Sequence, residues 1–242
     1  MKPILSVIMP TFNRGGNFLY KSITSLLRQD FTDFELIVID DCSSDETTAI
    51  VDDFKDSRIK YYRNSKNKGE YWSTNFAIEK ANSRYLTWLH SDDELPPLSL
   101  SSRIKLLNDR SELDFVHGDI TKIDSEGKLL QHIKATDSVG KEVFNDYLQN
   151  LRDGNMIYRI HHLSIMMKRE FMNKTGFFDT TLPFAGDIDW LLRALKIGVF
   201  LRIKRNLYQY RTHSQTRRIT DINNGVDKVG IHKKIASRYN FI

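Results

Sequence analysis

The segment LSVIMPTFNR, residues 5–14, decides the fold class. Its apolar run stops at Pro10, and a polar loop follows. Beyond the loop, apolar side chains return at helical spacing, at Leu19, Ile23, Leu26 and Leu27. A short apolar run bounded by a proline is typical of a buried strand, whereas apolar residues three or four positions apart predict a helix with one buried face. The stretch therefore predicts a strand, a loop and a helix.

The segment FELIVIDDCSSDET, residues 34–47, repeats this plan. An apolar run ends in Asp40 and Asp41, and the serines and aspartate that follow can cap a helix. A third strand is expected at residues 59–64 and a fourth at residues 84–90, with a helix between them. Strands that alternate with helices predict an α/β fold. Its Rossmann-like, mostly parallel sheet would be flanked by helices, and its ligand would bind at the carboxyl ends of the strands.

Length and composition agree with one folded domain. The chain has 242 residues, of which 40% are hydrophobic and 28% charged, so it can bury a core and is not a disordered sequence. No stretch approaches the roughly 18 apolar residues that span a bilayer, and the first residues lead directly into a strand, so we expect a cytoplasmic protein. The single cysteine, Cys42, excludes an internal disulfide and argues against a thiolate zinc site.

The formal net charge of +5 is unevenly distributed. Residues 201–242 hold ten Lys or Arg and two Asp, a local balance of 10 − 2 = +8. A basic segment of this kind can contact nucleic acid, anionic lipid or a phosphate-bearing substrate, or it can be a solvated face.

Acidic residues gather in three places: Asp40 with Asp41, Asp92 with Asp93, and Asp187 with Asp189. The first two pairs follow predicted strands, and in a parallel sheet they meet at one edge. Carboxylates there can accept hydrogen bonds from a nucleotide and hold the hard divalent cation that neutralises a diphosphate. Acids after strands can equally be turn or cap residues. This second interpretation is weaker for Asp92 and Asp93, because adjacent buried acids are costly without a cation or a donor.

Several segments, in order along the chain, resemble the inverting glycosyltransferases of family 2, which have the GT-A fold. The resemblance covers residues 3–216. It includes the first two strands with their loops, NKGEYWSTN at residues 67–75, TWLHSDDELPP at 87–97, FAGDIDWLLRALKIG at 184–198, and YRTHSQT at 210–216. The chain departs from the family pattern at Thr74, where an Arg is frequent, at His90, where the metal-binding motif usually has its first Asp, and at Gly186, where an acid is common.

The resemblance implies a single GT-A domain over residues 1–216. Residues 1–115 would form the nucleotide-sugar-binding half and residues 116–216 the acceptor-side half. Residues 217–242 would form a basic C-terminal tail. This tail could hold the enzyme near anionic membrane, where lipid-linked acceptors are located.

The resemblance also assigns site residues. Asp187 aligns with the general base, on a helix anchored by three leucines. Asp92 is expected to hold Mn²⁺ or Mg²⁺, with Asp93 as a second candidate. Arg211 and His213 are expected to add charge or ligation at the leaving diphosphate. The other expected donor contacts are Asp41 at the base or ribose, Phe12 beside the base, and Pro10, Thr11, Asn13, Arg14, Asn67, Gly69, Asn75 and Ser91. No role is expected for His117, His161 or His162.

The implied activity is a metal-dependent, inverting transfer of a sugar from a nucleotide diphosphate donor to a hydroxyl acceptor. A glycan or lipid-linked acceptor in polysaccharide, lipopolysaccharide or other cell-surface glycan synthesis is expected, with no nucleic-acid partner. A dinucleotide-dependent oxidoreductase would share the sheet but needs a G-x-G-x-x-G turn, and this chain has PTFNRGG at residues 10–16. A non-catalytic module that binds a sugar nucleotide stays open, because Gly186 and His90 depart from the family pattern.

Overall fold

The computed structural model describes residues 2–155, 159–182, 184–214, 216 and 226–242. Strand β1 (Leu5–Thr11) is central and fully buried, and it lies parallel to β2 (Phe34–Asp40) and β4 (Tyr85–Trp88). Strand β3 (Ile59–Arg63) extends the parallel part beyond β2. Pro10 is tolerated within β1 because β4 pairs only with residues up to Ile8, so the missing N–H removes no bond on that side. The four strands expected from the sequence are confirmed.

The second half of the sheet is mixed in direction. Strand β7 (Met166–Lys168) runs antiparallel to both β4 and β5 (Phe115–Ile123) and joins the two halves. Strand β5 also pairs with β6 (Leu129–Ile133) in antiparallel fashion and with β8 (Phe200–Arg211) in parallel. The sheet order is β3-β2-β1-β4-β7-β5-β6, with β8 on β5. The expected α/β fold with a mostly parallel sheet is confirmed.

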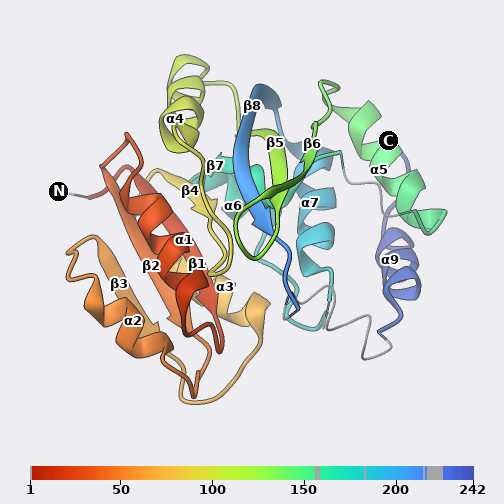
Figure 1. Ribbon diagram of the computed structural model, residues 1–242. Helices are drawn as coiled ribbons and strands as arrows, with labels where there is room; N and C mark the ends of the chain where they lie inside the picture. The colour runs from red at the N-terminus through yellow and green to blue at the C-terminus, as the bar shows by residue number, and fades with distance from the viewer. Residues whose placement is uncertain (1, 156–158, 183, 215, 217–225) are drawn as a thin grey trace.

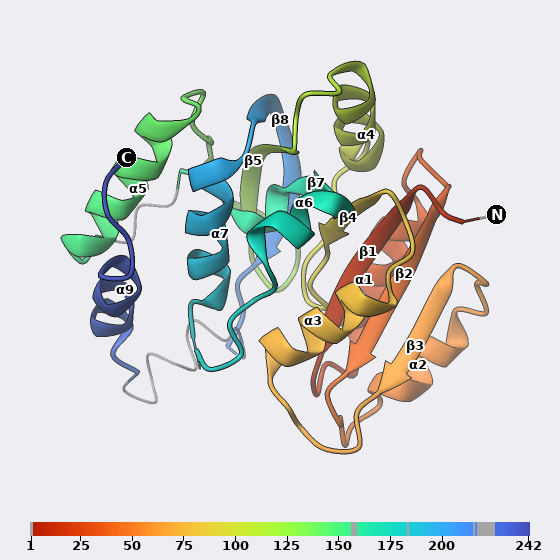
Figure 2. The same cartoon turned by 180° about the vertical axis from the view of Figure 1, so that it is seen from behind.

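Helices cover both faces of this sheet, as Figures 1 and 2 show from opposite sides. Helices α1 (Asn17–Leu27), α2 (Thr47–Asp53) and α4 (Ser99–Asp109) share one core cluster with Val7 and Met9 of β1. Helices α3 (Glu70–Lys80), α6 (Arg169–Thr175) and α7 (Gly186–Ile197) share the other with Ile8. Alternate residues of one strand therefore anchor opposite helical layers.

Two further helices lie beyond α7 at the edge of the fold (Figure 1). Helix α5 (Lys141–Arg152) buries one face, and α9 (Lys228–Ala236) packs against it through Ile235 and Ala236. Arg152 donates to the Tyr239 carbonyl (2.7 Å), which ties the chain end to α5. Helix α9 belongs to the expected tail of residues 217–242. Residues 217–225 lie outside the described residues, and the domain boundary at 216 stays a prediction.

Among the described residues, no helix combines the length and apolar character needed to cross a bilayer.

Candidate functional site

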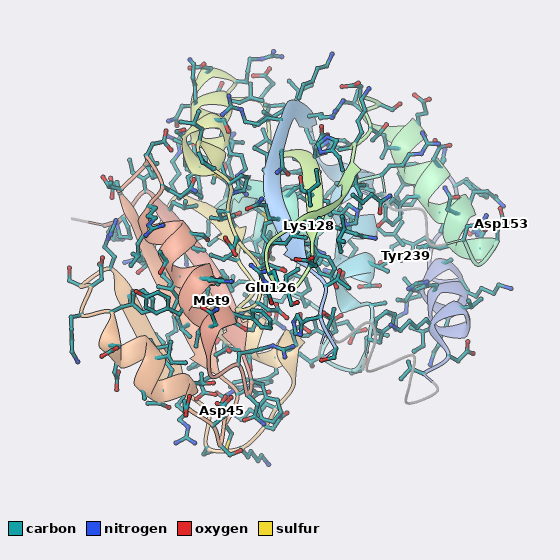
Figure 3. All side chains as sticks on the ribbon, in the orientation of Figure 1. Met9, Asp45, Glu126, Lys128, Asp153 and Tyr239 are labelled. Carbon is teal, nitrogen blue, oxygen red and sulfur yellow. The ribbon has the colours of Figure 1, made fainter. Side chains whose placement is uncertain are left out.

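A cavity of about 1030 Å³ opens at the carboxyl ends of β1, β2 and β4. Figure 3 shows the direction of these ends, with Met9 near the end of β1 and Asp45 on the loop beyond β2. The start of α7, a short 3₁₀ turn η1 (His162–Ser164) and parts of β5 and β6 form the opposite wall. The residues expected from the sequence that line this cavity are Pro10, Thr11, Phe12, Asn13, Arg14, Asp41, Asn67, Gly69, Ser91, Asp92 and Asp187.

The loop after β1 is tied to the loop after β2. The backbone N–H of Asn13 donates to Ser43 Oγ (2.8 Å). The side-chain oxygen of Asn13 accepts from the backbone N–H of Ser44 (2.9 Å). The Gly15 N–H donates to Asp45 (2.6 Å). Asn13 has a φ of 49°, a left-handed conformation that asparagine adopts more readily than most residues. These bonds fix the backbone on which Phe12 and Arg14 stand, and Phe12 remains 45% exposed in the cavity.

Asp41 stands at the end of β2 and organises the next loop. One carboxylate oxygen accepts from the Asn64 side chain and the Lys68 N–H (2.8 Å each), and the other accepts from the Gly69 N–H (2.7 Å). Gly69 has a φ of 91° and precedes the first residue of α3. Asp41 therefore holds a cavity wall in shape, and its expected contact with a base or ribose stays a prediction.

Asp92 follows β4 and faces the side chains of His213 and Arg14. Its Oδ2 lies 3.0 Å from His213 Nε2 and 3.4 Å from Arg14 Nη2. Burial would raise the pKa of Asp92, but the hydrogen bond from His213 and the charge of Arg14 lower it below its ordinary value. The structure thus places an ionised carboxylate on the cavity wall. His213 lies just behind it, with its ring 4.7 Å from that of Phe18.

Asp93 points the other way. It is fully buried, accepts the Tyr208 hydroxyl (2.8 Å) and the Arg211 backbone N–H (2.7 Å), and lies outside the cavity lining. Burial and the adjacent Asp92 charge raise the pKa of Asp93. Tyr208 also accepts the His90 N–H (2.9 Å), so Asp93 and Tyr208 together brace the loop that carries Asp92.

Arg211 is placed differently from the sequence expectation. Its side chain is fully buried behind the loop and donates to the Asp92 carbonyl (3.0 Å), to the carbonyls of Asp124 and Ser125, and to Glu94. The guanidinium binds backbone carbonyls of Asp92 and of the turn after β5, and the expected contact with a diphosphate stays a prediction. Asn75 is also outside the cavity lining, since its side chain exchanges two hydrogen bonds with the Phe178 backbone.

One group of side chains has the spacing of a metal site. Among the described residues, ligand atoms of His90, Asp92 and Asp93 all lie within 4.8 Å of one another. Burial lowers the pKa of His90, which favours the neutral imidazole that can ligate a metal. A set of carboxylate oxygens and an imidazole nitrogen can bind Mn²⁺. The carboxylate oxygens alone can also bind Mg²⁺.

Asp187 lies across the cavity in the first turn of α7. Its Oδ2 is 3.0 Å from His162 Nδ1, and its Oδ1 is 3.2 Å from the Tyr71 hydroxyl. Burial would raise the pKa of Asp187, but the charge and hydrogen bond of His162, together with the Tyr71 hydroxyl, hold it well below its usual range. The carboxylate is therefore ionised and accessible, with 27% of its side chain exposed.

Gly186 leaves room for one partner of Asp187. A Cβ at position 186 would lie 2.9 Å from the Tyr71 ring, closer than ordinary packing allows. Tyr71 occupies the space beside the backbone where the family pattern has an acid. The packing of the Tyr71 ring therefore explains why this chain has a glycine at position 186.

Asp189 has a different environment from Asp187. It is 3% exposed and accepts from Arg193, Arg238 and the Tyr239 hydroxyl. These contacts connect the start of α7 to residues 238–239, and a structural role for Asp189 stays a prediction.

Three side chains at the site were not expected from the sequence: Tyr71, His90 as a possible ligand, and His162. Tyr71 and His162 are separated from Asp187 by 116 and 25 residues, respectively, so no short motif connects them. The adjacent residues His161 and His162 suggest a metal site, but the sequence has no third ligand at a suitable spacing from them. His117 is buried in β5 and lies outside the cavity lining.

Comparison with known proteins gives one family. The model of the family described as "Glycosyl transferase family 2" matches residues 6–174. An uncharacterised glycosyltransferase of Rickettsia bellii is 29% identical over 216 residues, which is 88% of this chain and 30% of the relative. The Campylobacter jejuni protein named GalNAc(5)-diNAcBac-PP-undecaprenol beta-1,3-glucosyltransferase is 43% identical over 110 residues, 44% of this chain and 35% of the relative. The chain spans about a third of the length of the first Rickettsia relatives it matches.

Solved structures share the fold. S. aureus TarS 1-349 in complex with UDP-GlcNAc matches with a TM-score of 0.69 at 18% identity, covering 98% of this chain and 71% of that one. The mannosyltransferase PcManGT from Pyrobaculum calidifontis, in complex with GDP-Man and Mn²⁺, matches with a TM-score of 0.65 at 17% identity. It covers 99% of this chain and 66% of that one. At these identities the likeness shows the GT-A fold.

Proposed function

Because this chain belongs to glycosyltransferase family 2, we propose that it is a metal-dependent, inverting enzyme that transfers a sugar from a nucleoside diphosphate sugar to an acceptor hydroxyl. One observation carries the proposal. A single cavity, at the carboxyl ends of the parallel strands, is lined by Asp41, Asp92 and Asp187 from three separate parts of the chain. This is where an open α/β sheet binds its ligand.

The reaction is a displacement at the anomeric carbon. The acceptor oxygen attacks the anomeric carbon on the face opposite the diphosphate and forms the new bond. The bond to the diphosphate breaks, the diphosphate leaves with the bonding electrons, and the configuration at the carbon inverts. Asp187 accepts the hydroxyl proton, because its carboxylate is ionised, accessible and held by two donors. Arg14 faces the cavity beside Asp92 and adds positive charge on the donor side, where the leaving diphosphate would lie.

Asp92 would hold Mn²⁺ or Mg²⁺, with His90 and Asp93 as further ligand candidates and His213 beside them. A divalent cation there would neutralise the negative charge that develops on the leaving diphosphate. Asp92 fits this role best, since it lines the cavity while both carboxylate oxygens of Asp93 already accept hydrogen bonds.

A uridine or guanosine diphosphate sugar is the proposed donor class. TarS and PcManGT, which share the fold, were solved with UDP-GlcNAc and with GDP-Man. The loops after β1 and β2 form the donor side of the cavity, and Phe12 offers an exposed ring on which a base can stack.

The proposed acceptor is a glycan or lipid-linked sugar of cell-surface glycan synthesis. The Campylobacter relative is named for an undecaprenol-linked acceptor. Described basic residues of the chain end, such as Lys233 and Lys234 on α9, are exposed and could attract anionic lipid at the inner face of the membrane. Binding to phosphatidylserine vesicles at low salt that is lost at high salt supports this contact, and absence of binding at low salt removes it.

A ligand screen tests the donor class. Thermal unfolding is measured with UDP-GlcNAc, GDP-mannose and related donors, each with and without Mn²⁺, because a ligand that binds only the folded state raises the melting temperature. We expect one nucleotide class to stabilise the protein, more strongly with Mn²⁺. Stabilisation without turnover of the donor would favour a non-catalytic sugar-nucleotide-binding module, and no stabilisation by any donor would contradict the proposal.

A further inference from the structure

The carboxylate of Asp187 is held by two side chains from different elements. Tyr71, at the start of α3, reaches Oδ1, and His162, at the start of η1, reaches Oδ2. An Asp in the first turn of a helix can adopt more than one staggered rotamer unless other groups fix it. Two donors on the two oxygens define both the position and the plane of this carboxylate.

The contact with His162 defines which ring nitrogen carries the proton. An ionised carboxylate only accepts hydrogen bonds, so the Nδ1 atom that lies 3.0 Å from Oδ2 must carry a hydrogen. The low pKa of Asp187 is consistent with this arrangement. The His162 ring is therefore oriented with its Nδ1–H toward Asp187.

The segment that carries His162 is anchored in the sheet. The Ser164 hydroxyl donates to the His161 carbonyl (2.9 Å), and the Thr87 hydroxyl of β4 donates to the Ile165 carbonyl (2.8 Å). The His162 ring stands edge-on to buried Trp88, with ring centroids 6.5 Å apart. A histidine fixed in this way connects β4 to the start of α7, which lies beside η1 on the same wall of the cavity.

Resting on the proposed function, we propose that His162 is a positioning residue for the base: its Nδ1–H fixes Asp187 in the orientation that accepts the proton of the attacking hydroxyl. His162 acts through Asp187, and Tyr71 completes the support from the other side. Exact placement matters, because a shift of about 1 Å in a reacting group can lower a rate by about 10².

Two substitutions separate this role from others. Asn places an amide N–H close to the position of Nδ1 and offers nothing at the position of Nε2, whereas Ala removes both groups. The activity measured is release of UDP or GDP from UDP-GlcNAc and GDP-mannose with Mn²⁺. We expect His162→Ala to lower turnover by about 10- to 100-fold with donor affinity within about threefold of wild type. His162→Asn should restore turnover to within about fivefold of wild type.

His132 offers a matched control. It also pairs with an aspartate, Asp119, at 3.4 Å, but its side chain is 54% exposed and it lies outside the cavity lining. His132→Ala should leave turnover unchanged. A His162→Ala enzyme within threefold of wild type would overturn the proposal. A His162→Asn enzyme as impaired as His162→Ala would also overturn it, because Nε2 would then be the essential atom.

A measurement that does not depend on turnover tests the same contact. Long-range ¹H–¹⁵N NMR spectra, assigned by the signals missing in His162→Asn, report which nitrogen of His162 is protonated. We expect a protonated Nδ1 whose resonance moves in Asp187→Asn. A neutral ring protonated only on Nε2 would overturn the proposal. If wild type released no nucleotide from either donor, the proposed function would fail, while the spectra would still decide the contact.

Discussion

Asp92 and Asp93 are neighbours in the chain but lie in opposite surroundings. Asp92 lines the cavity beside Arg14 and His213, whereas Asp93 is fully buried against Tyr208 and the Arg211 backbone. The resemblance put Asp92 ahead of Asp93 as the metal ligand, but the sequence could not show their different surroundings, which depend on the course of the backbone after the strand. The position of Arg211 was also unpredictable. The sequence gave no sign that backbone carbonyls would accept the hydrogen bonds of its guanidinium.

Substitution of each aspartate should separate metal binding from stability. Asp92→Asn removes a hard anionic ligand, so calorimetry should show at least about a tenfold loss of Mn²⁺-dependent donor affinity. Asp93→Asn keeps that affinity within about threefold but disturbs two buried hydrogen bonds, at a cost of about 1–3 kcal/mol in unfolding free energy. Wild-type affinity in Asp92→Asn would refute the metal assignment.

Gly186 should be intolerant of even one added methyl group. A Cβ there meets the Tyr71 ring at 2.9 Å, so Gly186→Ala should cost about 1–3 kcal/mol in urea unfolding through overpacking. In a background of Tyr71→Ala the same substitution should cost much less, because the two changes act on one contact. Additive losses in the double variant would show that the ring is not what limits position 186.

At the scale of elements, the first four strands were predictable because each is a short apolar run followed by turn residues. The later strands were not. Strand β8 has the sequence FLRIKRNLYQYR, whose basic residues were counted with a charged C-terminal segment, yet it is a 12-residue strand parallel to β5. Strand β7 has three residues and is defined by its partners β4 and β5. Strands β7 and β8 form because they pair with segments that are distant in the sequence. A local sequence pattern does not reveal such pairing.

An ion pair between a buried carboxylate and an exposed lysine joins the parallel strands and should make stability depend on pH. Glu35 on β2 is 2% exposed, accepts the Ser6 hydroxyl of β1 (2.6 Å) and pairs with Lys60 of β3. Burial would raise the pKa of Glu35, but the hydrogen bonds from Lys60 and Ser6 lower it below its ordinary value. A carboxylate with a lowered pKa in the folded state stabilises the protein above its unfolded pKa, and this stabilisation is lost as the pH falls through the folded pKa.

The test compares Glu35→Gln with wild type in urea unfolding from pH 7 to acid. At pH 7 we expect a loss of about 1–3 kcal/mol, which shrinks as the pH falls below about 4, the ordinary range of a glutamate. Glu126, exposed on the turn between β5 and β6, supplies the control, and Glu126→Gln should change stability by less than about 0.5 kcal/mol. A Glu35→Gln loss that is constant with pH would contradict the account.

At the scale of the whole molecule, one sheet brings the two sides of the site together. The loops after β1, β2 and β4 form the wall proposed to bind the donor, and the start of α7 presents Asp187 from the other side. The carboxylates after β2 and β4 were predictable because they follow short apolar runs, whereas Asp187 was assigned by the resemblance to the family. The sequence could not predict the support of Asp187, since Tyr71 and His162 meet it only through the packing of α3, η1 and α7 around the cavity.

The most direct test of the account measures sugar transfer by Asp187→Asn and Asp189→Asn with an acceptor that wild type uses, beside donor affinity and melting temperature. Asn keeps the shape of Asp187 but cannot take the proton, so transfer should fall by about 10² to 10⁴ while donor binding is retained. Asp189→Asn should lower the melting temperature more than the rate, because Asp189 is buried against Arg193, Arg238 and Tyr239. An Asp187→Asn enzyme that transfers within tenfold of wild type would contradict the central claim, and an inactive but stable Asp189→Asn enzyme would move the base to Asp189.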